Sequence, residues 1–70
     1  MLHAKKDYDI SKIPEDEPVF LLRAQDRLSD MVVRYWAQLN EQYGGSEELS
    51  LAAREHAVKM AMWPERKMPD

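Results

Sequence analysis

The sequence predicts an all-α protein, a small three-helix domain in which a short helix precedes an antiparallel helical hairpin. Two amphipathic stretches with helical spacing of their apolar residues flank the dipeptide Gly44-Gly45, and this arrangement predicts the hairpin. An apolar stretch that follows a proline predicts the shorter helix. With 70 residues the chain has room for a single domain. We divide it into an extended acidic N-terminal arm at residues 1–17, a helical core at 18–63 and a tail at 64–70.

The first helix is expected over residues 18–27, because acidic residues followed by a proline are typical of a helix start. The apolar run at residues 19–22 leaves a strand as the alternative, since periodicity cannot assign so short a run. Such a strand would have to pair across a dimer, because the chain offers no second strand. We favour the helix because Ala24 and Leu28 continue the face of Phe20 at helical spacing.

The second helix is expected to begin at Ser29, its predicted N-cap, and to end at Tyr43. Gly44 is the predicted C-cap, because glycine readily adopts the left-handed conformation. Leu28 and Val33 have the spacing of a hydrophobic staple. The predicted core stripe of this helix, which should pack against the third helix, consists of Leu28, Val32, Tyr35, Trp36, Leu39 and Tyr43.

The third helix is expected to begin at the N-cap Ser46 and to end at Trp63, since Pro64 disfavours helical geometry at the residue before it. Its predicted core stripe consists of Leu49, Ala52, Ala53, His56, Met60 and Trp63. The two adjacent alanines of this stripe are expected to face Trp36 and Leu39, because large residues pack closely against small ones.

Several apolar residues are left over after the hairpin has formed. A small domain without cysteine cannot use disulfides, so we expect oligomerisation to support it, in the form of a homodimer. The candidate interface residues are Phe20, Leu21, Leu51, Val58 and Met62. In the alternative, the N-terminal arm folds back over this edge through Tyr8, Ile10 and Ile13 and leaves a monomer.

The charge distribution gives a second candidate contact. The net charge is -3, and acidic residues outnumber lysines in the N-terminal arm, which argues against a nucleic-acid partner. Arg23, Arg27 and Arg34 would nevertheless line one face if the first two helices ran nearly straight together, and such a face could contact phosphate. Asp26 and Asp30 lie between these arginines, so surface ion pairing is the favoured interpretation.

No pattern in the sequence predicts a catalytic, cofactor-binding or metal-binding residue. The segment Arg54-Glu55-His56 lacks the second histidine of a metalloprotease helix, and there is no cysteine nucleophile. His56 is interpreted as a core or interface residue. We therefore expect a non-enzymatic protein that binds another protein, with no cofactor. An enzyme subunit that completes a site only with its partner remains an open alternative.

Several segments of the sequence resemble those of a class of small proteins. The stretch Ile13 to Leu28, followed by Trp36-Ala37, Glu55-His56-Ala57 and Trp63-Pro64, resembles small uncharacterised proteins of tailed-bacteriophage and prophage genomes. The resemblance implies a phage-encoded accessory protein that binds a host or phage protein, for example as an inhibitor of a host defence or regulatory complex. It assigns no functional residue. Because no apolar run is long enough for a signal peptide or a membrane span, we expect the protein in the host cytoplasm and not in a membrane.

Overall fold

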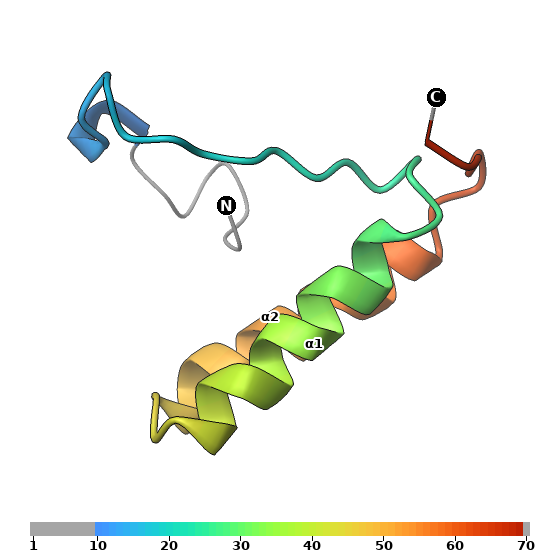
Figure 1. Cartoon of the computed structure of the whole chain (residues 1–70). Helices are drawn as coiled ribbons and strands as arrows, with labels where there is room; N and C mark the ends of the chain where they lie inside the picture. Colours follow the sequence, from blue (N-terminus) through green and yellow to red (C-terminus); the bar gives the residue numbers. More distant parts are fainter. Residues whose placement is uncertain (1–9, 70) are drawn as a thin grey trace.

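The computed structural model describes residues 10–69 and shows two antiparallel α-helices joined by a tight turn (Figure 1). Helix α1 spans Ser29–Gln42 and helix α2 spans Glu47–Ala61. A single turn of 3-10 helix, η2, spans Ile10–Lys12 and lies away from the hairpin. The predicted all-α class and the hairpin are therefore confirmed, and the described range contains no strand.

Residues 18–23 form an extended segment that leads from η2 towards the start of α1 (Figure 1). The helix predicted over residues 18–27 is absent, and turns occupy residues 24–28, so the three-helix prediction was wrong. A helix that is apolar on all sides would need more covering surface than the hairpin supplies. Of residues 18–27, only Leu22 and Ala24 pack against the hairpin core. In an extended backbone successive side chains point to opposite sides, so these two can face the core while their neighbours face away.

The predicted N-terminal arm is described only in part. Residues 1–9, including Tyr8, lie outside the described residues. In the remainder, η2 is followed by a turn in which the backbone N–H of Glu17 donates to the carbonyl of Pro14 at 3.1 Å. Ile13 is half-buried. The arm as a whole stays a prediction.

The two helices meet along a seam of mostly small residues. The buried residues of this seam are Ser29, Val33 and Ala37 from α1, and Ser50, Ala53, Ala57 and Met60 from α2. They recur every three or four positions, which places them on one face of each helix. Both polar residues of the seam are satisfied, because the hydroxyl of Ser50 donates to the carbonyl of Ala37 at 3.2 Å and that of Ser29 donates to the carbonyl of Asp26. Because the distance between helix axes depends on the side chains in contact, small residues favour a close approach.

The core stripe predicted for α1 is mostly wrong. Its residues Leu28, Val32, Tyr35 and Tyr43 are exposed, and Trp36 and Leu39 are only half-buried. Val33 and Ala37, each one position along from a predicted core residue, are buried instead. The apolar residues of α1 extend over more of its circumference than one partner helix can cover, and the smaller side chains occupy the covered part.

The core stripe predicted for α2 is correct at two positions. Ala53 and Met60 are buried as predicted, and Ala57 joins them. The other predicted residues lie outside the core: Leu49, Ala52 and Trp63 are exposed and His56 is half-buried. The predicted contact of Ala52 with Trp36 and Leu39 is therefore wrong, because α1 presents its small residues to α2.

The helix ends separate into correct and incorrect predictions. The hydroxyl of Ser46 accepts from the N–H of Leu49 at 3.3 Å, which confirms the N-cap of α2. Gly44 has a φ of 78°, which confirms its left-handed conformation, but α1 ends at Gln42 with Tyr43 as the C-cap, one residue earlier than predicted. Ser29 is not an N-cap, because its hydroxyl donates to the carbonyl of Asp26 at 2.7 Å. The side chain of Asp26 instead accepts from the N–H of Leu28 at 2.8 Å.

Candidate functional site

One end of the hairpin is closed by a polar network around Asn40. The side-chain amide of Asn40 donates to the carbonyl of Ser46 at 2.9 Å and to the hydroxyl of Ser50 at 2.8 Å. The carbonyl of Asn40 accepts from the N–H of Gly45 at 2.7 Å. These bonds connect the end of α1 to the start of α2. They therefore fix the rotation of each helix about its own axis, and with it the residues that each helix exposes.

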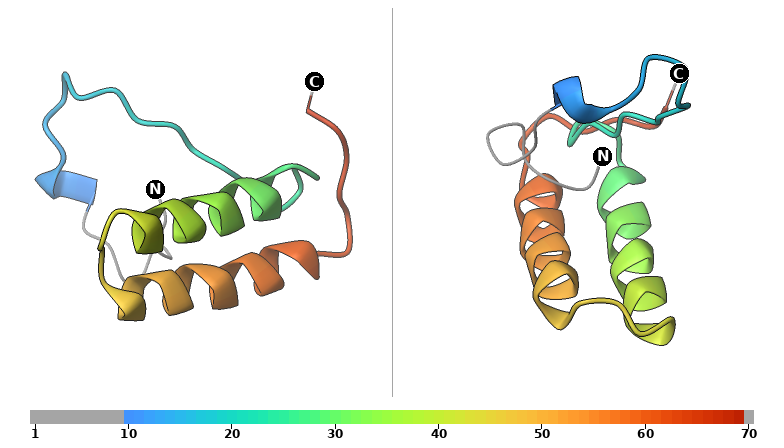
Figure 2. Two further views of the ribbon diagram at one scale, coloured as in Figure 1. Left: turned by 60° about the horizontal axis from the view of Figure 1, so that its bottom comes forward. Right: turned by 90° about the vertical axis from the view of Figure 1, so that its left-hand side faces the viewer.

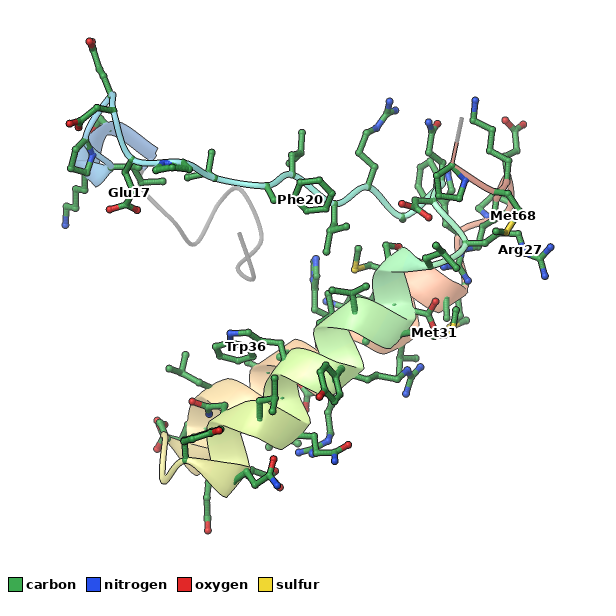
Figure 3. The ribbon with its side chains drawn as sticks, in the orientation of Figure 1. Glu17, Phe20, Arg27, Met31, Trp36 and Met68 are labelled. Carbon is green, nitrogen blue, oxygen red and sulfur yellow. The ribbon has the colours of Figure 1, made fainter. Side chains whose placement is uncertain are left out.

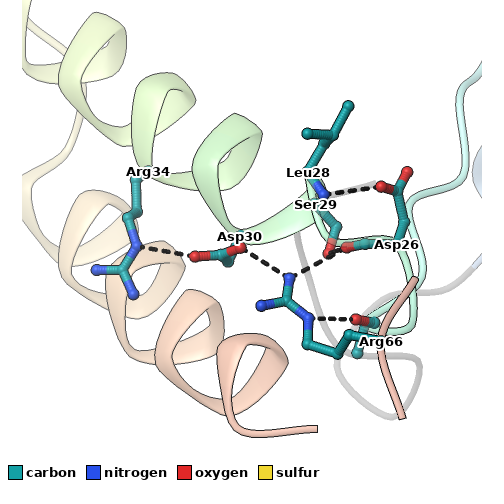
Figure 4. Close-up of polar contacts among 7 residues, drawn as sticks. Asp26, Leu28, Ser29, Asp30, Arg34 and Arg66 are labelled. Atoms are coloured by element: carbon teal, nitrogen blue, oxygen red, sulfur yellow. Dashed lines mark hydrogen bonds and ion pairs between the residues drawn. The ribbon is translucent and has the colours of Figure 1, made fainter. Parts of the chain in front are cut away.

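The opposite end is closed by Arg66, which lies in the tail after α2 (Figure 4). Its Nε donates to the carbonyl of Ala24 at 3.0 Å, and one terminal nitrogen donates to the carbonyl of Asp26 at 3.1 Å and to Asp30 Oδ1 at 2.7 Å. We call these four residues the Arg66 clasp. The hydrogen bond from Arg66 holds the pKa of the Asp30 carboxyl below its ordinary value of 3.8, although burial of the carboxyl acts in the opposite direction.

The tail continues alongside the turns that precede α1. The N–H of Lys67 donates to the carbonyl of Gln25 at 2.7 Å, and the N–H of Arg27 donates to the carbonyl of Lys67 at 2.9 Å. Figure 2 shows the tail and the chain before α1 side by side at this end of the hairpin. The clasp and this pairing together anchor the point from which the extended segment departs.

The extended segment presents large apolar side chains to solvent. Phe20 is 75% exposed and Leu21 is 63% exposed, and Val19 is exposed as well. Figure 3 shows Phe20 on the segment, at a distance from Trp36 of the hairpin. Phe20 and Leu21 were both predicted as interface residues, but on a helix rather than on an extended backbone.

Helix α1 carries an exposed apolar surface that sequence reasoning missed. Met31, Val32 and Tyr35 of α1 and Leu28 at its N-cap recur at helical spacing and are all exposed, and we call them the α1 stripe. Three of them were assigned to the core, so the stripe was not considered as a binding surface. Its signal in the sequence is an apolar face wider than one partner helix can cover.

Helix α2 carries a second exposed apolar surface, which was predicted. Leu51, Val58 and Met62 lie at i, i+7 and i+11, and we call them the α2 stripe. All three are exposed, and Met62 is 75% exposed. The five candidate interface residues therefore all lie at the surface, but on two separate elements.

The three arginines proposed as a polar contact do not share a helical face. Arg23 lies on the extended segment, Arg27 lies in the turn before α1, and only Arg34 is on a helix. That prediction depended on a helix at residues 18–27, which is absent. Nε of Arg34 lies 3.6 Å from Asp30 Oδ2, so this arginine already has a carboxylate partner.

Among residues 10–69, no group of three or more His, Asp or Glu side chains could hold a metal ion. Within the same range, no helix has the length and apolar character needed to cross a membrane. Glu41 of α1 pairs with Arg54 of α2, and this hydrogen bond lowers the pKa of Glu41 and raises that of Arg54. The pair links the two helices at the rim of the seam.

Comparison of the chain with family models, curated proteins and solved structures finds no match. The surface of the molecule is thus the basis for a functional proposal. Three exposed apolar surfaces, which are the extended segment, the α1 stripe and the α2 stripe, surround a hairpin whose interior is built from small residues.

Proposed function

We propose that this chain is a non-enzymatic protein-binding module that presents the outer faces of its two helices to another protein. The observation that carries the proposal is the α1 stripe. Its four apolar side chains are all exposed, whereas the buried residues of α1 are Ser29, Val33 and Ala37. Contiguous exposed apolar surface of this kind marks an interaction site, whereas single exposed apolar residues are ordinary.

The polar surroundings of the stripes support a docking function. The Asn40 network and the Arg66 clasp hold both ends of the hairpin, so the two stripes are displayed on a preorganised frame. Preorganised side chains lose less conformational entropy on binding. We extend the proposal to the phage resemblance: the partner is a host or phage protein in the host cytoplasm, and the module itself is a homodimer.

Nucleic-acid binding is the alternative function, and its support is weaker. The chain carries a net charge of -3, Arg34 pairs with Asp30, and Arg66 is engaged in the clasp. A salt titration distinguishes the two functions. Contacts with phosphate lose affinity steeply as salt increases, whereas an apolar interface does not.

The proposal is tested by affinity purification of partners with the full chain as bait. Two double variants place charges on the stripes, Val32→Glu with Tyr35→Glu on α1 and Val58→Glu with Met62→Glu on α2. Gln38→Glu is the matched control, because it adds a charge at an exposed position of α1 outside the stripe. We expect partners captured by the wild type and by the control to be lost from at least one double variant, with helicity by circular dichroism unchanged. Retention of the same partners by both double variants would overturn the proposal.

A further inference from the structure

Within residues 10–69, the extended segment has no partner for the backbone of residues 18–22 or for most of its side chains. Within the described residues, the N–H and C=O groups of residues 18–22 make no hydrogen bond. Val19, Phe20 and Leu21 are all exposed. An extended backbone with unpaired polar groups and apolar side chains is a template for pairing with another strand.

We propose that this segment pairs antiparallel with the same segment of a second copy of the chain, around a two-fold axis at Phe20. The inference rests on the proposed function, because it names the second copy as the partner of one of the three apolar surfaces. It leaves the α1 stripe and the α2 stripe free for a different protein. Self-association and partner binding are thereby assigned to separate parts of the molecule.

The charges that flank the segment favour a second copy. When Phe20 lies opposite its own symmetry mate, Glu17 of each chain lies opposite Arg23 of the other. Opposite charges directly across an antiparallel pair are stabilising. The two-fold axis generates this ion pair twice. Centring the axis on Val19 or on Leu21 would instead place one of these charges opposite an apolar residue.

The proline in the segment fits the same register. Residues in an antiparallel pair alternate between those whose backbone groups point to the partner strand and those whose groups point away. If the backbone groups of Phe20 point away from the partner strand, then those of Pro18, two residues earlier, also point away. The N–H that Pro18 lacks is then not needed. Val19 and Leu21 then exchange backbone hydrogen bonds with each other across the axis, and both have free N–H groups within the described chain.

Pairing would bring apolar side chains together on each face of such a ribbon. Directly opposite residues point to the same face, so Val19 and Leu21 of the two chains would form one apolar cluster. Phe20 shares the other face with Leu22, which packs against the hairpin core. The Phe20 pair would therefore lie on the side of the two hairpins. This contact is needed, because a two-stranded ribbon alone is only marginally stable in water.

Sedimentation equilibrium of the full chain across the micromolar to millimolar range tests the register through charge reversal. Glu17→Arg and Arg23→Glu each place like charges opposite each other at two symmetric sites, and each should weaken the dimer about tenfold or more. The double variant Glu17→Arg with Arg23→Glu restores opposite charges at both sites, so it should recover wild-type association. Circular dichroism checks that the hairpin is intact in each variant.

The α2-stripe variant Val58→Glu with Met62→Glu separates this inference from the proposed function. We expect it, and the α1-stripe variant Val32→Glu with Tyr35→Glu, to dimerise like the wild type, while at least one of the two loses the captured partner protein. A wild-type chain that stays monomeric, or a double charge reversal that fails to restore the dimer, would overturn the inference and leave the protein-binding part of the proposed function standing. The monomeric result would also remove the homodimer from that proposal. If the α2-stripe variant lost the dimer while the single charge reversals kept it, the inference would also be overturned. If the charge reversals weaken and restore the dimer as expected, but neither the α1-stripe nor the α2-stripe double variant loses the captured partner, the inference would be supported and the proposed function overturned.

Discussion

The two ends of the hairpin are closed by single polar side chains that act over very different distances along the chain. At the turn, Asn40 bonds to groups 6 and 10 residues away. At the other end, Arg66 bonds to groups 36 to 42 residues away. The turn also has the Ser46 cap and the positive φ of Gly44, whereas the clasp depends mainly on one guanidinium. We therefore expect the clasp end to be the more sensitive to a single substitution.

Removal of the guanidinium should have the largest effect. Arg66→Ala leaves the half-buried Asp30 carboxylate without its closest charged donor, and it also removes donors from two backbone carbonyls. Loss of hydrogen bonds to a charged group suggests a decrease of about 2 to 3 kcal/mol in the free energy of unfolding, measured by urea denaturation. Arg34→Ala is the control, because the more exposed Arg34 pair should cost less than about 1 kcal/mol. Equal effects for the two variants would show that the clasp has no special role.

Substitutions in the turn should decrease the free energy of unfolding less than Arg66→Ala does. The physical reason should differ between Gly44 and Gly45. A Cβ on Gly45 would collide with the Asn40 side-chain oxygen, so Gly45→Ala must displace Asn40 and its bonds, at about 1 to 2 kcal/mol. A Cβ on Gly44 meets nothing within 4 Å, but its φ of +78° is unfavourable for alanine by about 1 kcal/mol. Adding Asn40→Ala should remove the side-chain part of the penalty of Gly45→Ala, but not the part due to the Asn40 carbonyl oxygen, which would lie 2.9 Å from the new Cβ. It should remove none of the penalty of Gly44→Ala. A double-mutant cycle by thermal unfolding checks this, and independent effects of Gly45 and Asn40 would contradict it.

The smallest effect is expected from pH. The folded-state pKa of Asp30 lies below its ordinary value of 3.8, mainly because of the hydrogen bond from Arg66. The resulting stability is present above that value and is lost as the pH falls through the folded-state pKa. In Arg66→Gln this loss should be smaller, because the pKa of Asp30 returns towards its ordinary value. The free energies of unfolding of the wild type and of Arg66→Gln, measured between about pH 2 and 5, would show this difference. Parallel plots of the two free energies against pH would contradict the prediction.

The turn end of the molecule could be predicted from the sequence because its determinants are local. Ser46 and Gly44 act on backbone groups within three or four residues, and both were assigned correctly. The exposure of Leu51, Val58 and Met62 also followed from periodicity, since one partner helix cannot cover two edges of α2. These features need no information about the rest of the fold.

The errors arose where the choice depended on the tertiary partner. Periodicity identifies the apolar residues of α1 but not which of them face α2, so Val32 and Tyr35 were placed in the core instead of Val33 and Ala37. The run at residues 19–22 was assigned to a helix because the absence of a covering surface is a property of the whole molecule. Arg66 was overlooked for a related reason, since nothing near it in sequence indicates acceptors on the other side of the hairpin.

The long reach of the Arg66 clasp also imposes an order of events during protein synthesis. A chain grows from its N-terminus, so the extended segment and α1 leave the ribosome before α2, and α2 before Arg66. Hairpin contacts join neighbouring elements and can form quickly, whereas the clasp must wait for the tail. Until then the loop at residues 24–28 has its bonds to the start of α1 but none to the tail, so the direction of the extended segment is less constrained. We therefore expect nascent chains to gain helical structure first and to become able to pair with a second copy only after Arg66 has emerged.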